Sequence, residues 1–190
     1  MLNVALAAGV VGVQRMVEAW LSSRNRIYLL AQGGREYGAG HYRAVCIIHG
    51  AWLAALVVLL DQLTKNIVVA MMAEGQSIPI IPNIFHLTYI LNPGAAFGMF
   101  AHNRTFFICV ALLVLVIVWW FRKEILAEPL CVRAGTALFI GGAVGNLIDR
   151  AENGMVVDFF DFRIWPIFNV ADIAICIGVA CIAFYFWRHD

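Results

Sequence analysis

Charged residues are scarce in this sequence of 190 residues, where Asp, Glu, Lys and Arg together make up 13%. Globular proteins average roughly 25%. Hydrophobic residues make up 63% of the chain, and the mean hydropathy is +0.84. This composition indicates that a lipid bilayer surrounds most of the chain. The net charge of +1 gives no reason to expect a nucleic acid or an acidic partner.

The sequence also lacks the spacing of a metal site or a disulfide framework. Its five cysteines form no CxxC pair, and all but Cys131 lie inside apolar runs. We interpret them as small, buried apolar side chains. The five histidines are scattered without ligand spacing. We therefore predict neither a metal ion nor a cofactor.

Long apolar runs with few charges occur in four places. A helix that crosses the hydrocarbon core needs roughly 20 apolar residues. Trp119 and Trp120 close the second run, as aromatic residues do at a membrane interface. We predict a membrane all-α fold with four transmembrane helices, at about residues 44–67, 104–121, 130–149 and 167–187.

Residues 73–103 cannot form a spanning helix, because Pro79, Pro82 and Pro93 interrupt them. The segment 85–90 alternates weakly between apolar and polar residues, as a short strand does. Asn92 and Gly94 belong to a turn that follows. We predict a small β-rich periplasmic element between the first and second spans.

Residues 1–43 are the least informative part of the sequence. They hold five arginines, and their first apolar run is too short to span a membrane. We interpret them as a cytoplasmic extension of the 44–190 membrane domain. The alternative is an amphipathic surface helix over roughly residues 8–30. The extension also decides the orientation, because its arginines are the excess positive charge expected on the cytoplasmic side.

Acidic residues gather between residues 141 and 172. Asp172 opens the last apolar run, where a carboxylate costs ~2.5–3.5 kcal/mol on insertion scales. Two carboxylates in a dry pocket share one proton and can activate water without a metal. Asp158 follows apolar residues and is the better partner, whereas Arg163 can neutralise Asp161. We interpret Asp161 as a solvated or ion-paired loop residue and Asp149 as structural.

Other polar residues are placed to join this pair. Gly142, Asn146 and Arg150 repeat at every fourth position and so share one helix face, and Asn169 precedes Asp172 by three residues. Gly141 and Gly145 form a small-xxx-small pair that lets a second helix approach closely. Asp61 and Lys65 are also four residues apart. This last pair either closes the end of a helix at the interface or shapes the site.

Five segments carry a resemblance to a known family: DQLTK at 61–65, NPGAAF at 92–97, GNLIDR at 145–150, VVDF at 156–159 and FNVAD at 168–172. Each is weak alone, but together and in this order the sequence resembles bacterial lipoprotein signal peptidase, also called signal peptidase II. The resemblance implies an intramembrane aspartic endopeptidase of the bacterial inner membrane. It would cut a prolipoprotein on the amino side of a diacylglyceryl-modified cysteine.

The resemblance also implies roles for individual residues. Asp158 and Asp172 would be the catalytic pair, at the periplasmic face. The residues that line the site and bind substrate, or the inhibitor globomycin, would be Asn92, Gly94, Asn146, Arg150 and Asn169, with Asp61 and Lys65 in support. We expect a monomer that contacts membrane lipid and uses no cofactor.

Two other classes of protein fit buried acids in membrane helices. A small transporter or proton-coupled channel would use the acids as a proton relay, but no internal repeat of the kind common in transporters is visible. An accessory subunit of a membrane assembly would use them to hold helices together.

Overall fold

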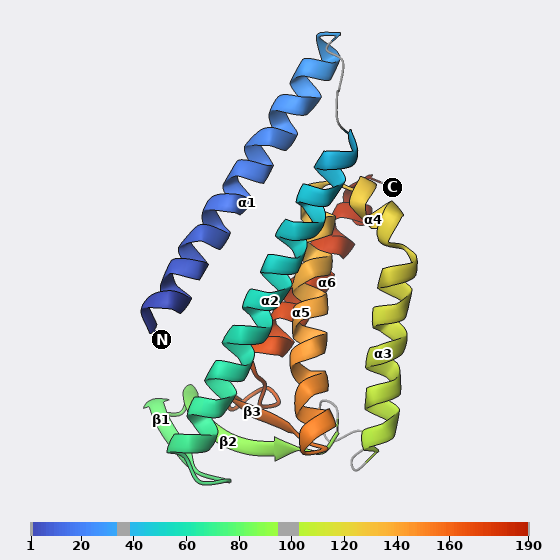
Figure 1. Ribbon diagram of the computed structural model, residues 1–190. Coiled ribbons are helices and arrows are strands. Elements are labelled where there is room, and N and C mark those ends of the chain that lie inside the picture. The colour runs from blue at the N-terminus through green and yellow to red at the C-terminus, as the bar shows by residue number, and fades with distance from the viewer. Residues whose placement is uncertain (1, 34–38, 95–102, 190) are drawn as a thin grey trace.

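The computed structural model describes residues 2–33, 39–94 and 103–189. Long helices lie side by side, and a small sheet sits at the end where α2 ends and α6 begins (Figure 1). The elements are α1 (Leu2–Ala31), α2 (Ala39–Met71), β1 (Ser77–Ile81), β2 (Phe85–Asn92), α3 (Arg104–Trp120), α4 (Arg122–Ala127), α5 (Leu130–Glu152), β3 (Val156–Asp161) and α6 (Val170–His189).

Three of the helices in the described ranges are long and apolar enough to cross a membrane. They are α2 over Tyr42–Met71, α5 and α6, and they confirm the first, third and fourth predicted spans. Helix α3 matches the second predicted span in position but has 17 residues. At 1.5 Å per residue it is roughly 25 Å long, slightly less than the ~30 Å hydrocarbon core. The structure is therefore a membrane-protein fold with three long apolar helices and one shorter one.

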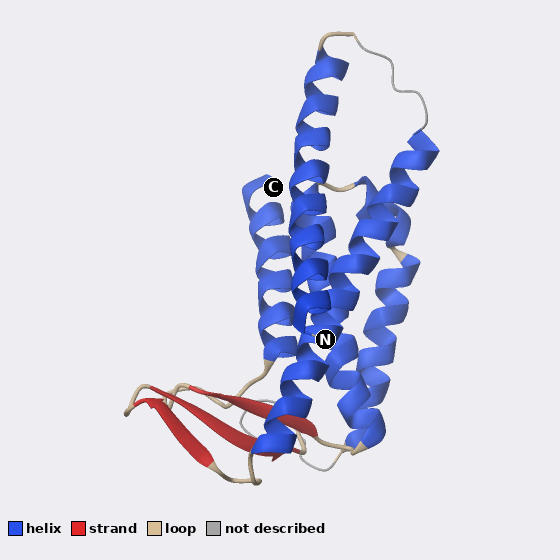
Figure 2. Ribbon diagram, turned by 60° about the vertical axis from the view of Figure 1, so that its left-hand side comes forward, coloured by secondary structure: helices blue, strands red, loops and turns tan. Residues whose placement is uncertain are grey.

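The sheet has three antiparallel strands in the order β1-β2-β3. Strands β1 and β2 form the predicted β-rich element, and they pair with Ser77 opposite Thr88. Strand β3 comes from the segment after α5, where we predicted no strand. It pairs with β2 so that Ile90 lies opposite Asp158 and Asn92 opposite Val156. Figure 2 shows the sheet extending to one side of the helices. Residues 95–102 of the predicted element lie outside the described ranges.

The N-terminal segment forms α1, a helix of 30 residues. It agrees with the helical alternative for residues 8–30 and is longer at its N-terminal end. Helix α1 contacts α2 and α5 and runs outside the other helices (Figure 1).

Glycines on α5 allow the neighbouring helices to come into backbone contact. A Cβ added at Gly141 would lie 2.7 Å from the Cβ of Val57 on α2, and one added at Gly145 would lie 2.5 Å from Oδ2 of Asp61. Nearer the start of α5, Gly135 and Gly178 bring α5 and α6 together. The predicted close approach at Gly141 and Gly145 is confirmed, and it holds α2 and α6 against the face of α5 that carries the polar residues.

The cysteines are free, but the prediction that they are buried is wrong, since Cys46 and Cys181 are only half-buried and the other three are exposed. Cys109, Cys131 and Cys176 are exposed on the helix surfaces. The prediction failed because an apolar run in a membrane protein has a lipid-facing side, on which a small apolar side chain is as well accommodated as in the interior.

Candidate active site

A buried ion-pair network links the middle of the molecule to the sheet end. Nζ of Lys65 lies 2.8 Å from Oδ2 of Asp61 and 2.8 Å from Oδ2 of Asp149, and it donates to Oδ1 of Asn146 at 2.9 Å. Gln62 donates to Oδ1 of Asp149 at 2.9 Å. Asp61 is 0% exposed and Lys65 is 3% exposed. All three ammonium donors therefore have acceptors, and two buried carboxylates share one cation.

Helix α2 continues six residues beyond Lys65, so Asp61 and Lys65 do not close a helix end. The first of the two alternatives for this pair is therefore wrong. Oδ1 of Asp61 instead accepts the backbone N–H of Ala171 in the first turn of α6, at 2.9 Å. The pair fixes where α6 begins.

The start of α6 is a reciprocal cap formed by Asn169 and Asp172. The backbone N–H of Asp172 donates to Oδ1 of Asn169 at 2.9 Å, and the backbone N–H of Asn169 donates to Oδ2 of Asp172 at 3.2 Å. This is the geometry of a capping box, with Asn at the cap and Asp three residues later. The cap holds the Asp172 carboxylate at the positive end of the helix.

Asp158 belongs to the sheet, and its side chain is hydrogen-bonded to the cap residue Asn169. It lies on β3, and its side chain is 2% exposed. Nδ2 of Asn169 donates to Oδ1 of Asp158 at 2.7 Å, and Nδ2 of Asn92 donates to Oδ2 at 2.9 Å. Strand pairing between β2 and β3 places Asn92 beside Asp158, although 66 residues separate them in the chain.

Amide side chains connect the two candidate catalytic carboxylates. Nδ2 of Asn146 donates to Oδ1 of Asp172 at 2.8 Å, and Oδ1 of Asn146 accepts from Nδ2 of Asn169 at 3.1 Å. Asn169 in turn contacts Asp158. Among the residues that the structure describes, neither Asp158 nor Asp172 is hydrogen-bonded or ion-paired to a lysine or arginine.

Arg150 closes the other side of this group. Its Nη2 donates to the carbonyl oxygen of Gly94 at 3.1 Å, and its guanidinium carbon lies 4.7 Å from the ring centroid of Phe107 on α3. The backbone N–H of Gly94 donates to Oδ1 of Asn92 at 2.9 Å, which is an Asx turn. Asn92 therefore serves both as the predicted turn residue and as a partner of Asp158.

The pKa values of the two carboxyl groups on β3 are shifted in opposite directions from their ordinary value. Burial, with the nearby negative charge of Asp172 in addition, raises the pKa of Asp158 to about 7. Burial also acts to raise the pKa of Asp161, but hydrogen bonds from Arg163 and Thr88 outweigh it, and the pKa of Asp161 lies below its ordinary value. At neutral pH, Asp158 therefore holds a proton in a large share of molecules and Asp161 does not.

The sequence interpretation of Asp161 was correct in one part and wrong in another. The residue is ion-paired, since Nη1 of Arg163 lies 2.9 Å from its Oδ2. It is not a solvated loop residue, because it ends β3 and is 3% exposed. Asp149 is buried among Lys65, Gln62 and the backbone N–H of Val157, in agreement with a structural role.

The structure brings all nine residues singled out from the sequence to one end of the helices. They are Asp61, Lys65, Asn92, Gly94, Asn146, Arg150, Asp158, Asn169 and Asp172. Sequence reasoning missed Gln62, which bridges Asp61, Asp149 and the carbonyl oxygen of Gly145. The sequence did offer a signal for Gln62, because it is a neutral polar residue that follows a charged residue, Asp61, in an apolar run.

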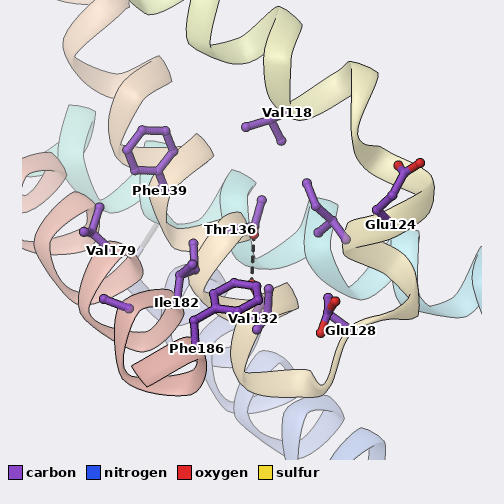
Figure 3. Close-up of a pocket in the computed structure, with 11 residues that line it drawn as sticks. Val118, Glu124, Glu128, Val132, Thr136, Phe139, Val179, Ile182 and Phe186 are labelled. Atoms are coloured by element: carbon purple, nitrogen blue, oxygen red, sulfur yellow. Dashed lines mark hydrogen bonds between the residues drawn. The ribbon is translucent and has the colours of Figure 1, made fainter. Parts of the chain in front are cut away.

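Two cavities lie away from this group. One of about 420 Å³ lies near the other end of the helices, between α3, α4, α5 and α6, and contains none of these residues. Its walls are mainly apolar, with Val132, Phe139, Val179 and Ile182 around it and Glu124 and Glu128 at one side (Figure 3). It therefore offers no chemistry comparable to that of the carboxylate group.

The fold and this polar group define a multi-pass membrane protein with a carboxylate-containing site at one end of its helices. Comparison with known proteins gives the family. A family model described as "Signal peptidase (SPase) II" matches residues 53–188, which include all nine residues of the site. The chain belongs to the signal peptidase II family, which is a family of bacterial membrane proteases.

Curated relatives and solved structures agree with this assignment. The chain is 44% identical over 137 residues to the lipoprotein signal peptidase of Halothermothrix orenii, covering 71% of this chain and 92% of that protein. It is 50% identical over 132 residues to that of Brevibacillus brevis, covering 67% and 87%. A solved structure titled as a bacterial membrane enzyme at 2.3 Å resolution matches with a TM-score of 0.67 and 33% identity, over 81% of this chain and 92% of that one.

Proposed function

We propose that this protein is an intramembrane aspartic endopeptidase that removes the signal peptide from prolipoproteins, cleaving on the amino side of the diacylglyceryl-modified cysteine. The observation that carries the proposal is the pair Asp158 and Asp172. Both carboxylates belong to one hydrogen-bonded group with Asn146 and Asn169, and within the described residues no cation is bonded to either. A pair held by neutral amides can move a proton between its members, whereas an ion-paired carboxylate is fixed in its charged form.

The two aspartates have different environments and so different proposed roles. Asp172 lies in the first turn of α6, at the positive end of the helix, and accepts two N–H hydrogen bonds. Asp158, with its pKa raised to about 7 by burial and by the charge of Asp172, is the member that carries the proton.

The proposed reaction follows from this assignment. Asp172 takes a proton from water as the water oxygen attacks the scissile carbonyl carbon, and Asp158 gives its proton to the carbonyl oxygen. The tetrahedral intermediate then collapses with cleavage of the C–N bond. The amide nitrogen takes up the proton held by Asp172, and Asp158 recovers the proton from the hydroxyl group.

We assign substrate binding to the residues around the pair. The amides of Asn92, Asn146 and Asn169 can each donate and accept, so they suit an extended peptide backbone. Gly94 and Arg150 bound the same space. Globomycin-type inhibitors would occupy these positions too. Asp61 and Lys65 are positioning residues, because they hold the first turn of α6 and the side chain of Asn146.

We also propose a placement in the membrane. Helix α3 is the second of four spans in the 44–190 domain, with Trp119 and Trp120 in the interface and none of its residues buried by the protein. The sheet and the catalytic pair face the periplasm at the inner membrane, in contact with lipid. Residues 1–43 are then a cytoplasmic extension, and the enzyme acts as a monomer.

The test is cleavage of a diacylglyceryl-modified reporter peptide by purified protein, with a mass readout of the new N-terminal cysteine. Asp158→Asn and Asp172→Asn should each lower the rate by about 10²–10⁴ or more, the range of general acid–base contributions. Globomycin should inhibit the unchanged protein.

Asp161→Asn is the matched control, because Asp161 is a buried carboxylate on the same strand that already has a cation as its partner. It should keep most of the activity. Full activity of either Asp158→Asn or Asp172→Asn, in protein that inserts normally into the membrane, would contradict the two-aspartate mechanism.

A further inference from the structure

A second cavity, of about 850 Å³, lies near the end of the helices away from the sheet. Its volume is in the range of roughly 300–1,000 Å³ that small-molecule sites occupy. Most of its wall is apolar and comes from α2, the end of α3, α4 and α5. The apolar lining includes Val45, Leu53, Leu126, Leu130 and Ile140. The carboxylate site plays no part in it.

Two arginines give this cavity a positive lining. Arg122 and Arg133 both border it, and the acidic residue among its lining residues is Glu18 of α1, which accepts from Nε2 of Gln14 at 2.9 Å. Within the described ranges, no carboxylate forms a salt bridge with either arginine. Arg122 donates to the carbonyl oxygen of Trp119 at 2.8 Å and lies over the Trp119 ring.

Only some of the hydrogen-bond donors of Arg133 have partners. Its Nη2 donates to the phenol oxygen of Tyr42 at 3.2 Å, and its Nη1 contacts Sγ of Cys46, a weak acceptor. Its Nε is buried without a hydrogen-bond partner. A half-buried guanidinium with a buried, unused Nε donor and uncharged hydrogen-bond partners is costly, unless an anion completes it.

We propose that this cavity binds an anionic phospholipid. The phosphate accepts hydrogen bonds from Arg133, with Nε among the donors, and an acyl chain lies along the apolar wall. Arginine suits this role because its planar fork matches two phosphate oxygens. Basic pockets between membrane helices are known to hold anionic head groups. A soluble phosphate would leave the apolar wall unfilled, whereas a lipid satisfies both parts of the cavity.

The neighbouring cavity in Figure 3 is an internal comparison. It is also bordered by apolar side chains, but its ionisable lining residues are Glu124 and Glu128. Two cavities of similar apolar character near the same end of the helices therefore carry opposite charge. If apolar filling alone decided lipid binding, both would take neutral and anionic lipids alike. We expect a preference for anionic lipid only where Arg133 lies.

Native mass spectrometry of the full-length protein in mild detergent tests the proposal. The probes are phosphatidylglycerol, phosphatidylethanolamine and diacylglycerol with the same acyl chains, together with inorganic phosphate. The unchanged protein should retain one phosphatidylglycerol and should prefer it over diacylglycerol. Arg133→Gln should weaken this retention by about five- to tenfold, and Arg133→Lys should weaken it less.

Lys123→Gln is the matched control, since Lys123 is an exposed cation on α4 that borders neither cavity. It should bind like the unchanged protein. If Arg133→Gln fails to fold, Arg122→Gln provides the second variant, with a smaller loss expected. Equal retention of phosphatidylglycerol by Arg133→Gln, equal binding of diacylglycerol, or binding of inorganic phosphate without lipid would each overturn the proposal.

Discussion

Two groups of acids lie at the sheet end of the helices and are held in different ways. Asp61 and Asp149 share the ammonium group of Lys65, with both distances at 2.8 Å. Asp158 and Asp172 are held by amide side chains and by backbone N–H groups. An ammonium group between two carboxylates holds them together, whereas a carboxyl group that is buried beside a second negative charge favours keeping a proton. The first group therefore stabilises the fold, and the second is suited to proton transfer.

Removing the shared cation, Lys65, should give the largest difference in stability between variants of the two groups. Lys65→Met leaves two carboxylates buried without a counter-ion, and breaking a buried ion pair in this way costs about 3–5 kcal/mol. We expect a large drop in the thermal unfolding midpoint in detergent. Asp158→Asn should change the midpoint much less, because it removes a desolvated charge and its amide oxygen keeps one of the two accepted hydrogen bonds.

Lys123→Met controls for loss of a positive charge, since Lys123 is exposed. It should change the midpoint little. A Lys65→Met protein as stable as the unchanged one would mean that Asp61 and Asp149 are not held by the ammonium group, and the contrast between the two groups would disappear.

A smaller effect is expected where α5 touches the ion-pair network. A methyl group at Gly145 would lie 2.5 Å from Oδ2 of Asp61, whose position is fixed by Lys65 and Ala171. Gly145→Ala should therefore lower the free energy of unfolding by about 1–3 kcal/mol, the usual cost of overpacking.

The comparison variant is Gly50→Ala, where the added methyl group would lie 4.0 Å from the Cβ of Ala137, an ordinary contact. Denaturation curves of the two variants should differ clearly. If they coincide, α5 and α2 have more freedom at Gly145 than the structure gives them.

The third prediction concerns pH and sharpens the difference in proton binding. The folded pKa of Asp158 is about 7, above its ordinary value of 3.8. Between these values the folded state keeps a proton that the unfolded state has lost, so stability contributed by this group falls as pH rises from about 4 to 7 and then levels. Cleavage should fall about tenfold per pH unit above 7, because the proton donor is lost.

Rate profiles and unfolding curves between pH 5 and 9 measure both trends. Asp158→Asn should abolish the part of the stability slope that belongs to this residue. Asp161→Asn should leave that part in place, because the pKa of Asp161 is shifted downward. A rate that stays constant up to pH 9 would contradict the assignment of Asp158 as the proton donor.

Much of the fold could be predicted from local patterns. The apolar runs predicted α2, α3, α5 and α6, and the prolines at 79, 82 and 93 excluded a helix where the structure has β1 and β2. Strand β3 was not predicted. Its residues, VVDFFD, lack the alternation of a half-buried strand because most of them are buried on both sides.

The candidate site was predictable in its residues but not in its connections. The spacing of Asn169 and Asp172 indicated one helix face, and the structure adds that they cap the helix reciprocally. The link from Lys65 to Asp149 joins residues 84 positions apart, and no local pattern encodes it. Asp161 was misplaced as a solvated residue because its burial depends on pairing of β3 with β2.

The sequence by itself determined that the chain belongs in a bilayer and which polar residues are too costly there to be incidental. That information is local, because the free energy of placing a residue in lipid depends mainly on its own side chain and on its neighbours along the helix. Only the tertiary structure decided which carboxylates received a cation and which received amides. That outcome depends on close helix contacts at glycines and on strand pairing across 66 residues, because these contacts set which donor each carboxylate can reach.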